Sequence, residues 1–117
     1  MQRQVNNRHI SILQGMTFIF QYCRLQYTKS KNYDEVEGAA IRQQAEYNVA
    51  RAFHQVGLET FAVKYYENAL RISEEFEGGG LGKRDLKFEA AHNLNLIFQL
   101  SGNTQAAREI AEKFLVL

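Results

Sequence analysis

The residues that could bind a metal or act as nucleophiles are few and far apart in this chain. Histidine occurs three times, at His9, His54 and His92, and cysteine once, at Cys23. Zinc sites need His and Cys ligands at short spacings, such as two histidines four residues apart on one helix. No pair here has that spacing. We therefore expect no metal site, and we expect His54 and His92 to pack against neighbours or lie at the surface.

The glycine-rich stretch 78–83 bears a superficial likeness to a phosphate-binding loop. That motif opens with glycine, follows a β-strand, and ends in Lys followed by Ser or Thr. Here Glu77 stands at the first glycine position and Arg84 at the Ser/Thr position, and a helical pattern precedes the stretch. The sequence around Glu74 and Glu75 carries no signal of an apolar pocket, so we expect their carboxylates to be solvated. We therefore expect no catalytic residues, no cofactor and no enzyme activity.

The composition is that of a small globular protein. The chain has 117 residues, 45% hydrophobic and 23% charged, with a formal net charge of +1. This balance suits one core and creates no strong field to attract nucleic acid. One cysteine excludes an internal disulfide and fits a reducing compartment. Residues 1–8 are polar, and no apolar run approaches the roughly 20 residues of a membrane span, so we expect neither a signal peptide nor a membrane helix.

The absence of proline predicts a mostly helical chain. About six prolines would be expected at the usual frequency of about 5%, and the sequence has none. Proline removes a helix hydrogen bond and clashes with the preceding turn, so long helices avoid it. Apolar residues also recur every three or four positions, and no segment alternates long enough to predict a strand. The predicted fold class is all-α, with about five helices.

Capping and turn residues divide the chain into helical units. Asn6 or Asn7 should cap a leading helix, Asp34 with Glu37 should form a capping box at the start of the next, and Asn103 should cap the last helix. Gly57 should end that helix, because glycine adopts the left-handed conformation without a steric clash. The expected units of a single module over 1–117 are a leading helix 7–28, a first repeat 34–76, a flexible Gly-rich loop 77–84 and a second repeat 85–117.

The two predicted hairpins are copies of one pattern. Aligning Gly57 with Gly102 sets an offset of 45 residues. Subtracting a loop of about 11 residues leaves about 34, the length of a tetratricopeptide repeat. Identical residues recur at this offset in both helices of the pair, which random amphipathic helices rarely achieve. Identical pairs include Asn48 and Asn93, Phe53 and Phe98, Ala62 and Ala107, and Leu70 and Leu115.

Residues 45–57 resemble the first helix of a tetratricopeptide repeat, and residues 58–70 resemble the second. Glu46 departs from the family pattern, because a bulky residue is usual there, and no proline ends the repeat. The second copy has Ala111 and Phe114 where a bulky residue and then a small one are expected. Small residues stand where the helices should touch, at Ala50, Ala62 and Ala69, and bulky ones between them, at Val49, Phe53 and Tyr66.

The whole string resembles the C-terminal repeats of the tetratricopeptide subunit of transcription factor IIIC, which acts at RNA polymerase III promoters. The discriminating parts are residues 7–15, the 53–58 turn and the closing repeat. The resemblance implies a non-catalytic nuclear scaffold that bridges other subunits and helps assemble the polymerase III initiation complex. The alternative is a generic peptide-binding module of the co-chaperone kind. That module would need several basic residues on its first helices, and only Arg51 qualifies.

A tetratricopeptide stack binds partners on the concave face that its first helices line. Asparagine there can bond a peptide backbone, and Arg51 can hold a carboxylate through two hydrogen bonds. Basic residues of the N-terminal third are followed at once by acidic ones at 34–37, so we expect a solvated surface and no direct contact with DNA. The expected partner-binding residues are Gln44, Tyr47, Asn48, Arg51, Gln55, Glu89, His92, Asn93 and Leu96.

The leading helix is too apolar to cap the stack. Stacked repeats bury a continuous core only with neighbours, and about three are needed. We therefore expect Ile12, Met16 and Ile19 to form an interface. Either a missing neighbour in a longer array covers these residues, or the isolated chain associates with itself through them.

Overall fold

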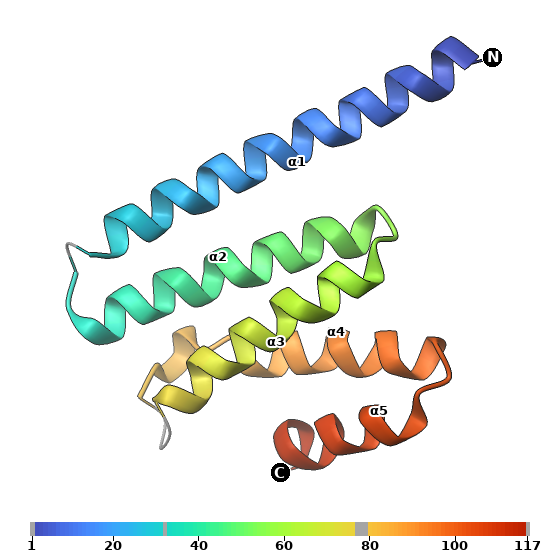
Figure 1. Cartoon of the computed structure of the whole chain (residues 1–117). Helices are drawn as coiled ribbons and strands as arrows, with labels where there is room; N and C mark the ends of the chain where they lie inside the picture. The colour runs from blue at the N-terminus through green and yellow to red at the C-terminus, as the bar shows by residue number, and fades with distance from the viewer. Residues whose placement is uncertain (1, 32, 77–79, 117) are drawn as a thin grey trace.

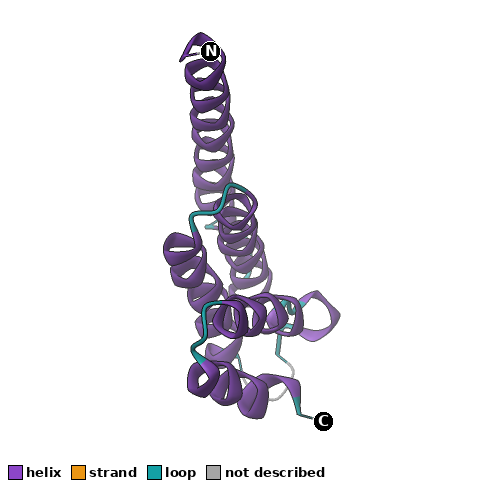
Figure 2. Ribbon diagram, turned by 90° about the vertical axis from the view of Figure 1, so that its right-hand side faces the viewer, coloured by secondary structure: helices purple, strands orange, loops and turns teal. Residues whose placement is uncertain are grey.

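The computed structural model describes residues 2–31, 33–76 and 80–116, with side chains from residue 14 onward (Figure 1). The described residues contain no β-strand (Figure 2), which confirms the predicted all-α class. The elements are α1 (Gln2–Ser30), α2 (Glu35–Gln55), α3 (Glu59–Glu75), the short 3-10 helix η1 (Gly82–Arg84), α4 (Lys87–Leu100), α5 (Thr104–Ile110) and the π-helical turn η2 (Ala111–Leu115).

The helices form a flat stack in chain order. Each helix packs chiefly on its neighbours in the sequence, α1 on α2, α2 on α3, α3 on α4 and α4 on α5. The molecule measures 53 × 40 × 17 Å, and the N-terminal part of α1 runs past the end of α2 (Figures 1 and 2). Such nearest-neighbour packing is typical of helical repeat proteins. The predicted stack of helical hairpins is thus confirmed.

The two hairpin turns are the same structural motif. Gly57 and Gly102 both have φ of 82°, which only glycine adopts readily. The N–H of the next residue then donates to the carbonyl five residues back, from Leu58 to Phe53 at 2.9 Å and from Asn103 to Phe98 at 2.8 Å. This is the Schellman ending of a helix. The glycines that the sequence aligned therefore perform one function in both hairpins.

Two of the predicted helix starts have side-chain caps, and one lies elsewhere. Asp34 accepts from the Glu37 N–H at 2.8 Å at the start of α2. Asn103 accepts from the Ala106 N–H at 3.3 Å at the start of α5. The leading helix begins at Gln2, however, so residues 6 and 7 lie inside it and do not cap it. Asparagine within a helix costs less than about 1 kcal/mol, so it does not force a start.

The predicted flexible loop is partly ordered. Residues 77–79 lie outside the described residues, but the side chain of Leu81 is buried against Ala39 and Ala40 of α2. It is flanked by Ile72 of α3 and by Phe76, the residue that follows α3. Gly82 has φ of 62° and leads into η1. Because one apolar side chain finds a pocket between α2 and α3, the end of the loop is held to the stack. Residues 82–84 of the predicted loop form a short 3-10 helix behind this anchored leucine.

A buried polar network ties the start of α4 to α2. Gln43 is fully buried, and its amide nitrogen donates to the Ala69 carbonyl at 3.1 Å and to the Asp85 carboxylate at 2.9 Å. Its amide oxygen accepts from the Leu86 N–H at 2.9 Å. Asp85 also accepts from the Ser73 hydroxyl at 2.6 Å. No buried side-chain polar atom among the described residues lacks a partner, so the network is complete.

Glu46 has a structural role where the repeat pattern has a bulky residue. The Tyr27 hydroxyl donates to one oxygen of Glu46, and the Asn68 amide donates to the other at 3.3 Å. One carboxylate thus joins α1, α2 and α3. Burial, together with this carboxylate, raises the pKa of Tyr27 well above its usual value.

Helices α1 and α2 approach closely near their connection. A Cβ on Gly38 would lie 2.8 Å from the carbonyl oxygen of Ser30, which is backbone and cannot swing aside. We expect Gly38→Ala to lower the free energy of unfolding measured by urea denaturation. Gly15→Ala is the matched control, because a Cβ there meets nothing within 4 Å. It should raise stability by up to about 1 kcal/mol through helix propensity alone. Equal gains from both changes would contradict the close approach.

Candidate protein-interaction surface

Two hollows meet on the surface formed by α1, α2 and α4. The first, of about 300 Å³, lies between α2 and α4. The second, of about 290 Å³, lies along the seam between α1 and α2. Arg51 and Gln55 line both hollows, so the two form one continuous surface. The other lining residues are His54, Tyr66 and Asn93 in the first, and Phe18, Ile19, Tyr22, Cys23, Asn48 and Ala52 in the second.

The structure brings together part of the predicted concave face. Asn48, Arg51, Gln55 and Asn93 line the hollows. Tyr47 lies beside them, because the Asn93 amide donates to its hydroxyl at 3.3 Å. Helix packing thus places asparagines of α2 and α4, which are 45 residues apart in sequence, on one surface. The remaining predicted residues lie outside both hollows and are Gln44, Glu89, His92 and Leu96.

The residues predicted to form an interface on the leading helix lie partly against the core of this chain. Met16 and Ile19 are partly buried and pack against the main core. The side chain of Ile12 lies outside the described residues. Cys23 and Tyr27 of the same helix also face α2, because they donate hydrogen bonds to the Ala45 carbonyl and to the Glu46 carboxylate. Ile19 lines the seam hollow as well, so the role of this part of α1 as an interface stays a prediction.

Sequence reasoning missed the two most exposed aromatic residues of this surface. Phe18 is 69% exposed and Tyr22 is 50% exposed, and both line the seam hollow. They are four residues apart and therefore lie on one face of α1. Leu25, also exposed, continues the same face. This i, i+4, i+7 spacing was the available signal, but periodicity alone does not say which of several apolar stripes is buried.

The buried side of the surface holds a hydrogen-bonded tyrosine. The Tyr66 hydroxyl lies 3.1 Å from Nδ1 of His54. Burial is the main cause that raises the pKa of Tyr66 to about 12, and Tyr47 adds to it. The phenol therefore stays neutral at physiological pH and can act as a hydrogen-bond donor.

This pKa predicts alkaline destabilisation. In the unfolded chain a tyrosine loses its proton near its ordinary pKa of about 10, whereas folded Tyr66 retains it to about 12. The folded state binds more protons between these values, so the free energy of unfolding should fall as pH rises from 10 to 12. Denaturant titrations at each pH measure this, with absorbance at 295 nm reporting phenolate. Tyr66→Phe should reduce the slope, and an unchanged slope would contradict the assignment.

The described residues show structural roles for the groups that could carry chemistry. The Cys23 thiol is buried and donates to the Ala45 carbonyl at 3.4 Å. Burial, followed by the charge of Glu46, raises its pKa, which disfavours the reactive thiolate. No group of three His, Cys, Asp or Glu among the described residues could hold a metal ion. Nor is any helix within the described part of the chain both long and apolar enough to cross a membrane.

Comparison with known proteins gives one consistent group of relatives. No protein-family model and no solved structure matches the chain. The chain is 40% identical, over 99% of its length, to transcription factor tau subunit sfc4 of Schizosaccharomyces pombe. It is 35% identical over 98% to the 131 kDa subunit of transcription factor tau of Saccharomyces cerevisiae, and 36% identical over 93% to general transcription factor 3C polypeptide 3 of Homo sapiens.

These relatives are much longer than the chain. It spans 12% of the fission yeast protein, 10% of the budding yeast protein and 11% of the human protein. All three are named as components of transcription factors and none as an enzyme. The resemblance drawn from the sequence is thus confirmed, and the chain is homologous, over nearly all its length, to a segment of transcription factor IIIC subunits.

Proposed function

We propose that the chain is a protein-interaction scaffold within a nuclear transcription factor IIIC subunit. It bridges other subunits and helps assemble the RNA polymerase III initiation complex, without catalysis. This proposal rests on one observation. The packing of α2 and α4 brings four predicted binding residues to the lining of two adjoining hollows: Asn48, Arg51, Gln55 and Asn93. Homology to named transcription factor subunits supports the setting.

The tetratricopeptide nature of the module is part of the proposal. Phe53 stacks on Phe61 and Tyr65, at centroid distances of 5.2 and 5.5 Å. Phe98 lines a hollow with Ala106 and Ile110. At the offset of 45 residues, Ala106 corresponds to Phe61 and Ile110 corresponds to Tyr65. Equivalent residues thus surround equivalent phenylalanines. Two such hairpins present their first helices, α2 and α4, on one face, where repeat proteins bind partners.

Contact with nucleic acid is not part of the proposed function. Arg24 and Lys29 are exposed on α1, but Glu35 and Glu37 follow at the start of α2. A surface of mixed sign with a net charge of +1 over the whole chain gives little counterion release on binding to phosphates. We therefore assign binding to protein partners.

Affinity capture from nuclear extract tests the proposed function. The full chain should retain factor IIIC subunits, and a variant with Asn48, Arg51 and Asn93 all changed to alanine should lose them. The matched control changes Lys64, Glu67 and Arg71, which are exposed on α3, to alanine and should capture these subunits normally. Unchanged capture by the first variant would contradict the proposed surface. Capture of chaperones in place of factor IIIC subunits would favour a generic peptide receptor.

Self-association of the isolated chain is expected through α4. Leu96 and Leu100 are exposed and one turn apart, so they form an apolar strip on this helix. We expect the sedimentation coefficient to rise with concentration in the micromolar range. A Leu96→Gln, Leu100→Gln variant should remain monomeric. A concentration-independent monomer for the unmodified chain would contradict this expectation.

A further inference from the structure

Helix α1 adds exposed aromatic side chains to the surface of α2 and α4. Phe18 and Tyr22 form one wall of the seam hollow, and Ile19, Cys23 and Ala52 supply further apolar lining. Aromatic side chains beside a hollow gain much from desolvation when a partner covers them, and they are frequent anchors of binding energy. The seam hollow therefore suits a large apolar side chain.

The charge on this surface is of one sign. Arg51 is exposed and is the only fully ionised side chain among the residues that line the two hollows. The ion pair found among the described residues joins Lys113 of η2 to Glu74 of α3. Within the described part of the chain, Arg51 therefore has no ion pair with a carboxylate. The Arg51 guanidinium lies 5.9 Å from the centre of the Tyr47 ring, a contact that favours one orientation of the side chain.

The remaining lining groups are neutral hydrogen-bonding side chains. Asn48 and Gln55 line the seam hollow beside Arg51, and their amides can both donate and accept. His54 is the other basic side chain that lines the two hollows. A basic segment would be repelled by Arg51, because no carboxylate lines the two hollows to attract it. A nucleic acid would find too few cations.

We infer, on the basis of the proposed interaction role of this surface, that its occupant is an acidic segment of a partner protein. The segment places a large apolar side chain against Phe18 and Tyr22 and a nearby carboxylate against Arg51. Arginine binds carboxylates through two parallel hydrogen bonds, which fixes the register of the segment. Asn48 and Gln55 bond its backbone. The site thus extends across the α1–α2 seam and is not confined to the first helices of the repeats.

Selection from a phage-displayed library of random 12-residue peptides on the full chain tests this inference. Enriched peptides should carry Asp or Glu within a few residues of a large apolar side chain. Arg51→Gln should weaken binding of an enriched synthetic peptide at least tenfold. The same peptide with the acid changed to its amide should bind the unmodified chain as weakly, and combining both changes should add little. A Phe18→Ala, Tyr22→Ala variant should also lose at least tenfold.

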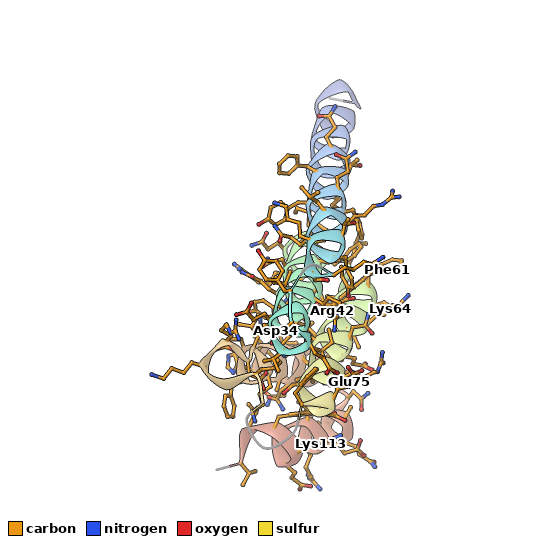
Figure 3. The ribbon with its side chains drawn as sticks, turned by 90° about the vertical axis from the view of Figure 1, so that its left-hand side faces the viewer. Asp34, Arg42, Phe61, Lys64, Glu75 and Lys113 are labelled. Carbon is orange, nitrogen blue, oxygen red and sulfur yellow. The ribbon has the colours of Figure 1, made fainter. Side chains whose placement is uncertain are left out.

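Matched controls lie on another face of the molecule. Phe61 and Lys64 lie on the α3 side, away from α4 (Figure 3), and neither lines the two hollows. Lys64→Gln and Phe61→Ala should change peptide binding less than twofold. Circular dichroism should show the same helix content for all variants, because the changed side chains, Phe61 and Lys64 included, are exposed.

The outcomes separate the inference from the proposed function. A selection that enriches nothing, or peptides without acids, would overturn the acidic-segment inference, and so would an Arg51→Gln variant that binds normally. If the Asn48, Arg51 and Asn93 variant nevertheless loses factor IIIC subunits in the capture experiment, the scaffold function stands. If capture is unchanged while acidic peptides bind at Arg51, the chemistry of the site stands but its assignment to factor IIIC subunits fails.

Discussion

Leu81→Ala is expected to lower the free energy of unfolding by about 2–5 kcal/mol, the usual range for a leucine removed from a core. Leu81 is 2% exposed and packs in a small cluster apart from the main core, with Ala39 and Ala40. Small residues on that side cannot expand to fill the space, so a cavity would remain. Urea denaturation followed by circular dichroism measures the change.

Leu100→Ala is the matched control for this prediction. Leu100 is 75% exposed, so its truncation should change stability by no more than about 0.5 kcal/mol. Equal effects of the two changes would show that Leu81 does not anchor the loop. A large effect of Leu81→Ala would establish that the glycine-rich connection contributes to the fold. Glycine there allows the turn at Gly82, where φ is 62°, while the leucine secures it.

Gln43→Leu should destabilise the protein by about 2–4 kcal/mol. Leucine has similar bulk but no polar atoms, so the Leu86 N–H loses its acceptor and Asp85 loses one donor. Leaving a buried polar group unsatisfied costs about 1–3 kcal/mol, and more when it is charged. The Ala69 carbonyl loses a donor as well. Thermal and urea denaturation should both report the loss.

A neighbouring glutamine and a double-mutant cycle test this prediction. Gln44 is exposed, so Gln44→Leu should have an effect within about 0.5 kcal/mol. Asp85→Ala combined with Gln43→Leu should cost less than the sum of the single changes, because both remove the same contact. Additive effects would contradict a shared network. Since this network holds α4 against α2, Gln43→Leu should also weaken partner capture although it lies away from the hollows.

The sequence alone determined the features that depend on residues close together in the chain. The Asp34 cap, the Asn103 cap and the turns at Gly57 and Gly102 each involve hydrogen bonds within about five residues. The amphipathic spacing predicted helices, and the recurrence of Phe53 as Phe98 revealed the two hairpins. The resemblance to factor IIIC subunits also came from the linear order of motifs. Caps, turns, helices and the repeat can therefore be predicted without knowing how the helices pack.

Only the tertiary structure decided which side chains meet across helices. Gln43 and Asp85 are 42 residues apart, and nothing local marks them as partners. Leu81 in a glycine-rich stretch looked like part of a solvated loop until α2 and α3 supplied its pocket. Helix α1 has several apolar stripes, and its position against α2 partly buries Met16 while leaving Phe18 exposed. Periodicity reveals that a helix has faces, but the packing of its neighbours selects the face that is left for a partner.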